Sequence, residues 1–456
     1  MILLKKENSI IKIARSGLCI GCGMCIAVCP NNAIELMIDG RKGIYLPIIS
    51  TQKCNDCGAC VKSCPGMGID FKKYNLNIFG EFPDDLLLGN HIKSYSGFAC
   101  DKTVRINSSS GGLITALLIH ALEHNLIDGA LVTRMKRESP LEPESFIART
   151  PKEIIDSSKS KYCPVPFNAG IREILNSEKD ERFAVVGLPC HIHGIRKLED
   201  QSKIVRNKIP FHLGLFCTHT PTFAGTEFLL DKILTLKKSD IKNMHYRGSG
   251  WPGLMKIQTK NDRTIEFQYS GIWDKELVSV GNIVMSFIHP RCCQCIDGSN
   301  ELADISFADA WNDKYRNDVL GRSFIISRNK IGQDILRSAA ESGKIEINEI
   351  DSKEIKESQK MLEFKKRRFH SLRRLYKTIG KSYPEYNYEF KISDPRSLYR
   401  SVLFEHMWRN IVRYHPSLWS FHKLYLFKKL NYSAQELSHL RKQATQQQTE
   451  TVLRTQ

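Results

Sequence analysis

The sequence predicts an α/β core that follows a small cysteine-rich domain and precedes a basic, mainly helical segment. Between residues 90 and 350, apolar runs of strand length alternate with helical patterns, as in an α/β (α+β) domain. Two cysteine-rich repeats lie before this core, within residues 1–80. The formal net charge is +18, and residues 361–456 carry 19 lysines and arginines against 7 acidic residues, a net of +12. With 456 residues, 41% of them hydrophobic, the chain is long enough for several domains.

The two repeats space their cysteines as C-x2-C-x2-C-x3-C and end in proline. The first is "CIGCGMCIAVCP" at 19–30, and the second is "CNDCGACVKSCP" at 54–65. Three closely spaced thiolates suit three corners of a [4Fe–4S] cube, and a fourth cysteine before proline reaches the neighbouring cube. A zinc site is the alternative, but zinc motifs usually bring two ligands per loop in distant pairs. The segment therefore looks like a bacterial-type ferredoxin domain with two crossed clusters, one held by Cys19, Cys22, Cys25 and Cys64 and the other by Cys54, Cys57, Cys60 and Cys29.

The core begins with a small-residue loop that leads into an apolar helical pattern at residues 113–122. Backbone N–H groups, hydroxyls and the positive end of a helix together make a phosphate-binding loop. An ordinary helix start is the alternative, because serine is favoured there for capping alone. The candidate phosphate-binding residues are Ser108, Ser109, Ser110, Gly111 and Gly112.

Four further cysteines are candidates for a third cluster. Cys190 and Cys217 each end an apolar run of strand length, and ligands bind at the carboxyl ends of strands in open α/β sheets. Cys292 and Cys295 form a C-x2-C loop, and four thiolates complete one cube. The alternative is that these thiols pack in the core as small apolar groups. Cys100, Cys163 and Cys293 receive no role, although Cys293 could replace either of its neighbours as a ligand.

The cysteine usage and the chain start suggest a cytoplasmic protein. The first residues lack the apolar stretch and cleavage site of a secretory signal, so reduced, metal-binding cysteines are expected rather than disulfides. The strongly apolar stretch 113–122 is too short to span a bilayer.

The basic segment mixes cations with aromatic residues at helical spacing, at 364–381 and 397–430. Helices packed on the core are one interpretation, and peripheral binding to an anionic membrane is another. Docking to an acidic electron donor or another protein is a third. We expect no nucleic-acid binding, since no recognition motif accompanies the charge. Because no candidate ligand follows residue 361, we expect the segment to be separable from the cofactor sites, provided that it does not cover the core. We expect residues 443–456 to be disordered.

Several motifs carry a family resemblance. The stretches "SSSGGLITALLIHALE", "VVGLPCHIHGIR", "LGLFCTHTP", "RGSGWPG" and "RCCQC…ELADISFADAW" resemble, in this order, the beta-subunit family of coenzyme F420 hydrogenases and dehydrogenases over residues 90–350. The resemblance implies a core that binds FAD, in many members with a [4Fe–4S] cluster beside it. It thereby implies a third cluster on the four cysteines above and a flavin phosphate site at the 108–112 loop.

Two residues depart from the family pattern. Cys293 adds a thiol to the C-x2-C loop, and Ala308 stands where the family leads us to expect glycine. The chain also lacks nickel-type C-x2-C pairs, so we do not expect it to split hydrogen itself.

The function expected from these features is that of an iron–sulfur flavoprotein oxidoreductase. A flavin beside clusters joins hydride chemistry to one-electron transfer, and the protein positions the cofactors and sets their potentials. The resemblance implies a deazaflavin such as coenzyme F420, or another small organic molecule, as the two-electron partner. Ferredoxin or another iron–sulfur protein would be the donor. The alternatives are a non-catalytic electron-relay subunit of a larger redox complex and an iron–sulfur scaffold without turnover.

The acid/base group is not identified by the sequence. Lys161, Tyr162, His191 and His193 are candidates near predicted site loops. Asp304 and Asp309 are candidates for binding ribityl or substrate hydroxyls, or for capping a helix.

Overall fold

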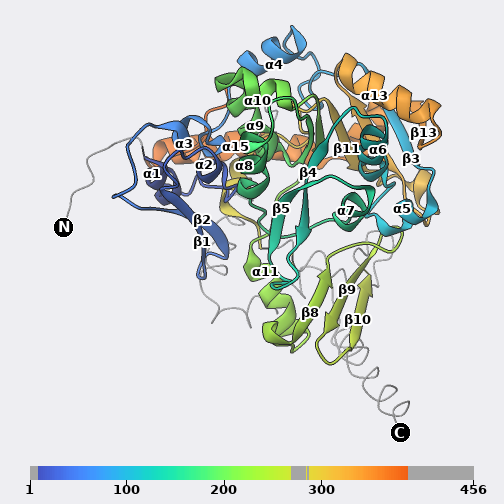
Figure 1. The fold of residues 1–456 in the computed structure, drawn as a ribbon, viewed down its shortest axis with the longest axis horizontal. Helices are drawn as coiled ribbons and strands as arrows, with labels where there is room; N and C mark the ends of the chain where they lie inside the picture. The colour runs from blue at the N-terminus through green and yellow to red at the C-terminus, as the bar shows by residue number, and fades with distance from the viewer. Residues whose placement is uncertain (1–8, 269–283, 285–286, 389–456) are drawn as a thin grey trace.

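A mixed eight-stranded sheet forms the centre of the molecule in a computed structural model (Figure 1). The structure describes residues 9–268, 284 and 287–388, so the predicted helical stretch 397–430 and the tail 443–456 lie outside the described residues. The strand order is β13-β3-β12-β11-β7-β6-β4-β5. The strands are β3 (Lys93–Ala99), β4 (Gly129–Met135), β5 (Pro143–Ala148), β6 (Phe183–Gly187), β7 (His212–Leu215), β11 (Ile305–Asp309), β12 (Ser323–Ser327) and β13 (Ile345–Ile350).

The four central strands β4, β6, β7 and β11 run parallel, while each of the other four pairs antiparallel with its neighbours. Helices cover both faces of a parallel sheet, so the sequences of its strands are continuous runs of apolar residues. In β6, the side chains of Phe183, Ala184 and Val185 are all fully buried. The mixed α/β fold predicted from the sequence is confirmed.

Helices cover both faces of this sheet. One face carries α6 (Leu113–Glu123), α7 (Pro151–Asp156) and α13 (Lys330–Glu341), and the other carries α8 (Asn168–Asn176) and α9 (Pro189–Gln201). The other core helices are α5 (Lys102–Asn107), α10 (Lys203–Lys208), α11 (Phe223–Phe228), α14 (Ser352–Ser358), the π-helical turn η2 (Leu229–Ile233) and the 3-10 turns η3 (Lys238–Asp240), η4 (Pro290–Gln294) and η5 (Asp313–Tyr315). No helix in the described ranges is long and apolar enough to cross a membrane.

A second sheet of three antiparallel strands lies at the lower end of the molecule in Figure 1. It contains β8 (Ile241–His245), β9 (Leu254–Thr259) and β10 (Thr264–Gln268). The predicted hairpin corresponds to β9 and β10, and β8 adds the third strand. Phe228 and Leu230 are fully buried with this sheet in one apolar cluster.

The N-terminal cysteine-rich domain packs against the α8–α9 face of the core (Figure 1). Its elements are α1 (Ile10–Arg15), α2 (Met24–Ala27), β1 (Ile34–Asp39), β2 (Ile44–Ile49), α3 (Ala59–Lys62), the 3-10 turn η1 (Pro65–Met67) and α4 (Phe71–Phe79). The Phe167 N–H donates to the Cys22 carbonyl at 2.7 Å, and Arg172 donates to the Ile26 carbonyl at 2.7 Å. The first cysteine repeat is therefore fixed directly to the core.

The basic helix α15 (Met361–Thr378) is inserted into the core rather than separated from it. Leu362, Phe369 and Leu372 are buried, and the side chains of Lys365 and Lys366 are each only 1% exposed. The condition for separability, that this segment does not cover the core, is therefore not met by the described part. Charge spacing along a helix does not reveal which of its cations find buried partners.

We predict that Phe369→Ala lowers the free energy of unfolding by about 3–5 kcal/mol, because it removes a buried ring from the α15 interface. The Phe369 ring lies edge-on to Tyr386 with centroids 5.1 Å apart. The shift in the urea unfolding midpoint measures the effect. Phe364→Ala, at an exposed position of the same helix, is the control and should change stability little. Equal shifts for the two variants would contradict the packing of α15.

Candidate functional site

The structure brings the eight N-terminal cysteines together in the two crossed groups expected from their spacing. Burial raises the pKa of Cys22, and the neighbouring thiols of Cys64, Cys25 and Cys19 raise it further. Burial likewise raises the pKa of Cys60, to which Cys57, Cys29 and Cys54 add. The fourth cysteine of each repeat thus lies with the first three of the other. We call Cys19, Cys22, Cys25 and Cys64 the inner group, and Cys29, Cys54, Cys57 and Cys60 the outer group.

Equivalent backbone turns shape the two repeats. Gly23 and Gly58 precede the four-residue helices α2 and α3 with φ of +71° and +76°, a left-handed conformation that favours glycine. These helices carry the third cysteine of each repeat, Cys25 and Cys60. In the described parts of the chain, no three His, Cys, Asp or Glu side chains converge closely enough to hold a single metal ion.

A third group of four cysteines lines a cavity of about 40 Å³ inside the core. Cys217 follows β7, and Cys292 and Cys295 lie in and just after η4. Cys190 lies in the first turn of α9, because strand β6 already ends at Gly187. This cavity volume is several times the volume required to hold one buried water molecule. We call these four residues the core group.

Cys293 does not belong to the core group. Its side chain is buried beside Ile288, Leu372 and Tyr376, and it is not among the residues that line the small cavity. It therefore packs as a small apolar residue.

The inner and core groups are adjacent. Ile20 and Pro65 of the N-terminal domain also line the small cavity, and the Cys22 thiol contributes to raising the pKa of Cys190 after burial and the other core-group thiols. Lys197 of α9 donates to the Cys64 carbonyl at 2.8 Å. The cysteine groups thus follow one another from the N-terminal domain into the core.

A second, larger cavity of about 400 Å³ opens at the carboxyl ends of the parallel strands. Its size is in the range of cofactor and substrate sites. The cavity shares part of its wall with the small one, namely Val165, Leu188, His191, Cys217 and Thr220. A molecule bound there would lie directly beside the core group.

The 108–112 loop contributes four of its five residues to the larger cavity: Ser108, Ser109, Ser110 and Gly112. Gly112 precedes α6 with φ of +75°, and among the described residues no side chain caps this helix end. Leu113, Ile114 and Thr115 of the first turn of α6 also line the cavity, so its free N–H groups and positive helix end favour an anion there.

Gly111 does not line this cavity, which corrects its assignment to the binding surface. Its N–H donates to the Ser323 Oγ at 3.0 Å, and an added Cβ would lie 2.7 Å from the Gly97 carbonyl oxygen. Glycine is required here by close packing against β3 and β12.

Arg247 is a cavity residue that was not predicted. It is 2% exposed and forms a 2.5 Å ion pair with Asp309. Its guanidinium lies 4.9 Å from the ring centroid of Trp251 and 5.3 Å from that of Trp311, within the range of cation–π contacts. Arg247 and Trp251 belong to the "RGSGWPG" motif, which could have signalled a site.

The two aspartate candidates have different surroundings. Asp309 lies at the cavity, whereas Asp304 is buried elsewhere in an ion-pair network with His212 and Arg196. Burial would raise the pKa of Asp304, but Arg196 and His212 lower it well below its usual range. Asp304 is therefore structural.

The acid/base candidates are mostly engaged in structural contacts. His191 lines both cavities, but its Nδ1 accepts from the Leu188 N–H and its Nε2 contacts the Val165 carbonyl at 3.1 Å. Burial lowers the pKa of His191 to about 4, so it is neutral near pH 7. His193 contacts Asp297 through its Nε2 at 2.9 Å. Neither histidine is therefore favoured as the acid/base group.

Lys161 and Tyr162 both line the larger cavity. Burial lowers the pKa of Lys161 to about 7, and its Nζ donates to the carbonyls of Ser157, Ser158 and Lys159. Because the Lys161 ammonium donates its N–H groups to these carbonyls, the side chain stabilises the C-terminal end of α7. Tyr162 packs edge-on against Tyr246 with ring centroids 6.1 Å apart.

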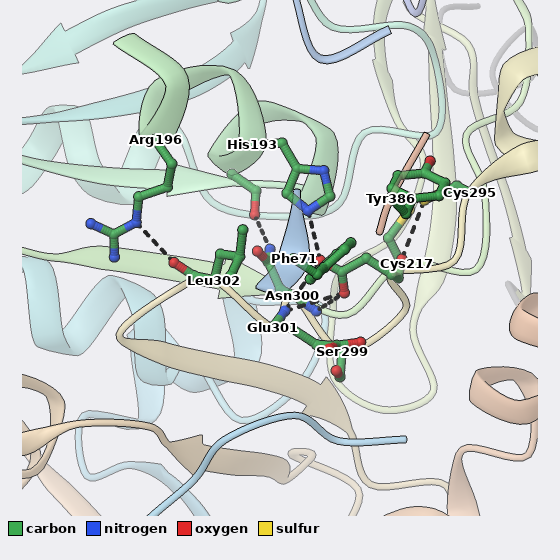
Figure 2. Close-up of polar contacts among 12 residues, drawn as sticks. Phe71, His193, Arg196, Cys217, Cys295, Ser299, Asn300, Glu301, Leu302 and Tyr386 are labelled. Atoms are coloured by element: carbon green, nitrogen blue, oxygen red, sulfur yellow. Dashed lines mark hydrogen bonds and ion pairs between the residues drawn. The ribbon is translucent and has the colours of Figure 1, made fainter. Parts of the chain in front are cut away.

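Behind the core group lies a buried network of charges around the 297–302 loop (Figure 2). The Asp297 carboxylate contacts His193 and accepts from the backbone N–H groups of Asn300 and Glu301. Glu301 pairs with Lys366 of α15 at 2.6 Å, and both side chains are at most 1% exposed. This network fixes the loop that follows Cys295.

Comparison with known proteins identifies the core. Residues 94–172 and 180–353 match the N-terminal and C-terminal models of the coenzyme F420 hydrogenase/dehydrogenase beta subunit, and residues 18–69 match a 4Fe-4S dicluster domain. The chain belongs to this beta-subunit family. It is an iron–sulfur member of an oxidoreductase family, with a dicluster domain fused in front of the family core.

Relatives cover most of the chain at low identity. The beta subunit of a coenzyme F420 hydrogenase in Methanosarcina barkeri is 24% identical over 59% of this chain and 85% of its own length. The coenzyme F420-dependent sulfite reductase of Methanocaldococcus jannaschii is 27% identical over 75% of this chain and 49% of its own length. A chain of the F420-reducing [NiFe] hydrogenase complex of M. barkeri has the same fold, with a TM-score of 0.51 and 22% identity over 67% of this chain and 99% of that chain.

We predict that Lys366→Met destabilises the protein more at alkaline than at acidic pH. Burial raises the pKa of Glu301 to about 7, above its usual 4.5, even though Lys366 opposes this. The Glu301 carboxyl thus favours the folded state below about pH 4.5, and this contribution is lost as the pH rises through 7. Without Lys366 the folded-state pKa rises further, so we expect a loss of about 3–5 kcal/mol at pH 8 and less at pH 5.5.

Urea unfolding at the two pH values measures this difference. Lys353→Met, at an exposed position paired with Glu357, is the control and should show no such pH dependence. A destabilisation by Lys366→Met that is equal at pH 5.5 and 8 would rule out an unpaired Glu301 as its cause.

Proposed function

We propose that this protein is an iron–sulfur flavoprotein oxidoreductase that relays electrons between ferredoxin-type clusters and FAD. The observation that carries the proposal is the wall shared by the two cavities: Cys217 and His191 border both the space between the core-group cysteines and the larger cavity. A third [4Fe–4S] cluster on Cys190, Cys217, Cys292 and Cys295 would then lie beside a flavin in the larger cavity.

The order of the cysteine groups supports a relay. Cys57 of the outer group is exposed, whereas Cys22, Cys25 and Cys64 of the inner group are buried against the core. The outer group thus offers contact with an external donor, and the inner group adjoins the core group. Ferredoxin or another iron–sulfur protein is the proposed donor.

The larger cavity supplies contacts that suit FAD. The FAD phosphates would bind at the 108–112 loop, where the backbone N–H groups at the start of α6 favour an anion. The Ser108, Ser109 and Ser110 hydroxyls donate to the carbonyls of Val104, Arg247 and Arg322 and so shape the loop. The Arg247–Asp309 pair offers a fixed polar edge, and Trp311, beside the Arg247 guanidinium, adds an aromatic ring to the cavity wall. When bound, a flavin exchanges two electrons as a hydride and one electron at a time with clusters.

The proposed two-electron partner is a deazaflavin such as coenzyme F420, or another small organic molecule. This proposal is based on two relatives, one named as a subunit of a coenzyme F420 hydrogenase and the other as a coenzyme F420-dependent sulfite reductase. Lys159 adds positive charge to the cavity wall, which suits an anionic substrate, whereas Arg247 is paired with Asp309. We also propose a cytoplasmic location. The basic segment would then make peripheral contact with an anionic membrane.

The second candidate function is that of an electron-relay component within a larger complex. It is favoured by relatives that are named as parts of multi-subunit enzymes, one in a coenzyme F420 hydrogenase and one in an F420H2 dehydrogenase. In this case the exposed outer group would face a neighbouring protein of the complex rather than a diffusing donor.

We predict that the protein purified under anaerobic conditions holds about twelve iron atoms, at four per cube, together with FAD. Cys217→Ser should lose one cluster's worth of iron, because it removes a core-group thiolate, and should leave the spectra of the other two clusters unchanged. Cys293→Ser is the matched control, since this thiol packs outside the small cavity. About eight irons in the wild type, or the absence of flavin, would refute the proposal; iron analysis and mass identification of the released flavin decide it.

We also predict that the isolated chain, with its clusters chemically reduced, reduces coenzyme F420 without another protein. The larger cavity would place the flavin and its substrate within this chain. The loss of deazaflavin absorbance under anaerobic conditions measures turnover. Turnover that appears only when a partner protein is added would favour the relay candidate instead.

A further inference from the structure

Helix α15 places a buried lysine against the core group. Lys365 is 1% exposed, and its Nζ donates to the Cys217 carbonyl and the Asp297 carbonyl, each at 2.7 Å. The same Asp297 carbonyl contacts the Cys295 Sγ at 3.4 Å. Lys365 therefore joins the strand end that carries Cys217 to the loop that carries Cys295. It lies beyond residue 353, where the family match ends.

The neighbouring lysine has a different electrostatic role. Lys366 is neutralised by the buried Glu301. Among the residues that the structure describes, Lys365 has no carboxylate within ion-pair distance, and its hydrogen-bond acceptors are backbone carbonyls. An ammonium buried without a counter-charge costs several kcal/mol.

The missing negative charge is supplied if the core group holds a cluster. Four thiolates give a cluster a net negative charge, which becomes larger when the cluster accepts an electron, and such charges help to set its reduction potential. Lys365 lines the small cavity together with all four core-group cysteines.

We propose that Lys365 is the buried counter-charge of the third cluster and raises its reduction potential, so that this cluster accepts one electron from the neighbouring N-terminal cluster. The step moves a single electron, with no bond formed and no proton taken up. Lys365 acts as a positioning residue, because it contacts the backbone around the ligands.

Two arginines also lie near the core group. Arg291 donates to the Gly66 carbonyl and the Tyr386 hydroxyl, and Arg368 donates to the Cys292 carbonyl at 3.1 Å. Asp297, the nearby carboxylate, contacts His193. Removal of Lys365 therefore leaves two arginines in place and should shift the cluster potential rather than abolish the cluster.

The inference rests on the proposed function, because it assumes a third cluster. The experiment compares Lys365→Gln, which keeps an N–H donor without the charge, with Lys365→Arg, which keeps the charge. Lys377→Gln removes a charge at an exposed position of the same helix and is the control. Iron content and the midpoint potential of each cluster, from anaerobic titration followed by electron paramagnetic resonance, are measured in full-length protein.

We expect the redox equilibrium of the third cluster in Lys365→Gln to shift at least about tenfold toward the oxidised form, which is about 59 mV for one electron. Lys365→Arg and Lys377→Gln should stay near the wild-type value, and the two N-terminal clusters should not change. Loss of the third cluster in Lys365→Gln but not in Lys365→Arg would also support the counter-charge. An unchanged potential in Lys365→Gln, or equal loss of the cluster in both variants, would overturn it. A wild-type content of about eight irons would instead refute the proposed function itself.

Discussion

The buried guanidinium of Arg291 joins three parts of the chain on which the arrangement of the site depends. Its Nε donates to the Gly66 carbonyl of the N-terminal domain, and its Nη2 donates to the Tyr386 hydroxyl beyond α15. Arg291 itself directly precedes Cys292. Because these hydrogen bonds are buried, the loss of one would leave an unsatisfied polar group, and the three segments are held in one arrangement. This contact helps to hold the inner and core groups side by side, together with the hydrogen bond from Lys197 to the Cys64 carbonyl.

The second constraint is the direction of the central strands. Since β6, β7 and β11 are parallel, their carboxyl ends meet at one edge of the sheet. This places Cys217 and Asp309 at the same edge, with Cys190 in the helix that follows β6. The larger cavity forms at this edge and receives the start of α6, so a polar helix end, an ion pair and Cys217 of the core group border a single space.

The basic residues of α15 have the sequence pattern of a solvent-exposed helix, yet two of its lysines are buried and have structural roles. Lys365 and Lys366 are adjacent in sequence and equally buried, yet one meets carbonyls beside the cysteine group and the other meets a carboxylate. The difference comes from the 297–302 loop, in which the Glu301 carboxylate contacts Lys366 and the Asp297 carbonyl accepts from Lys365. If the proposed cluster is present, its electrostatic tuning by Lys365 would depend on a helix outside the family core.

The sequence by itself determined the α/β class, the family and the pairing of the eight N-terminal cysteines, because spacing within one short loop limits which thiols can face a common cube. It also selected Cys190, Cys217, Cys292 and Cys295 from strand ends and a C-x2-C loop. It missed β3 and β5, whose mixed polar and apolar residues give no clear strand signal, and it assigned Gly111 to a binding surface when close packing requires it. Only the tertiary structure decided that Arg247 lines the cavity, that Asp304 is structural and that Lys365 reaches the core group. Those contacts join residues far apart in sequence, and the cost of burying a charge is set by partners that no local pattern contains.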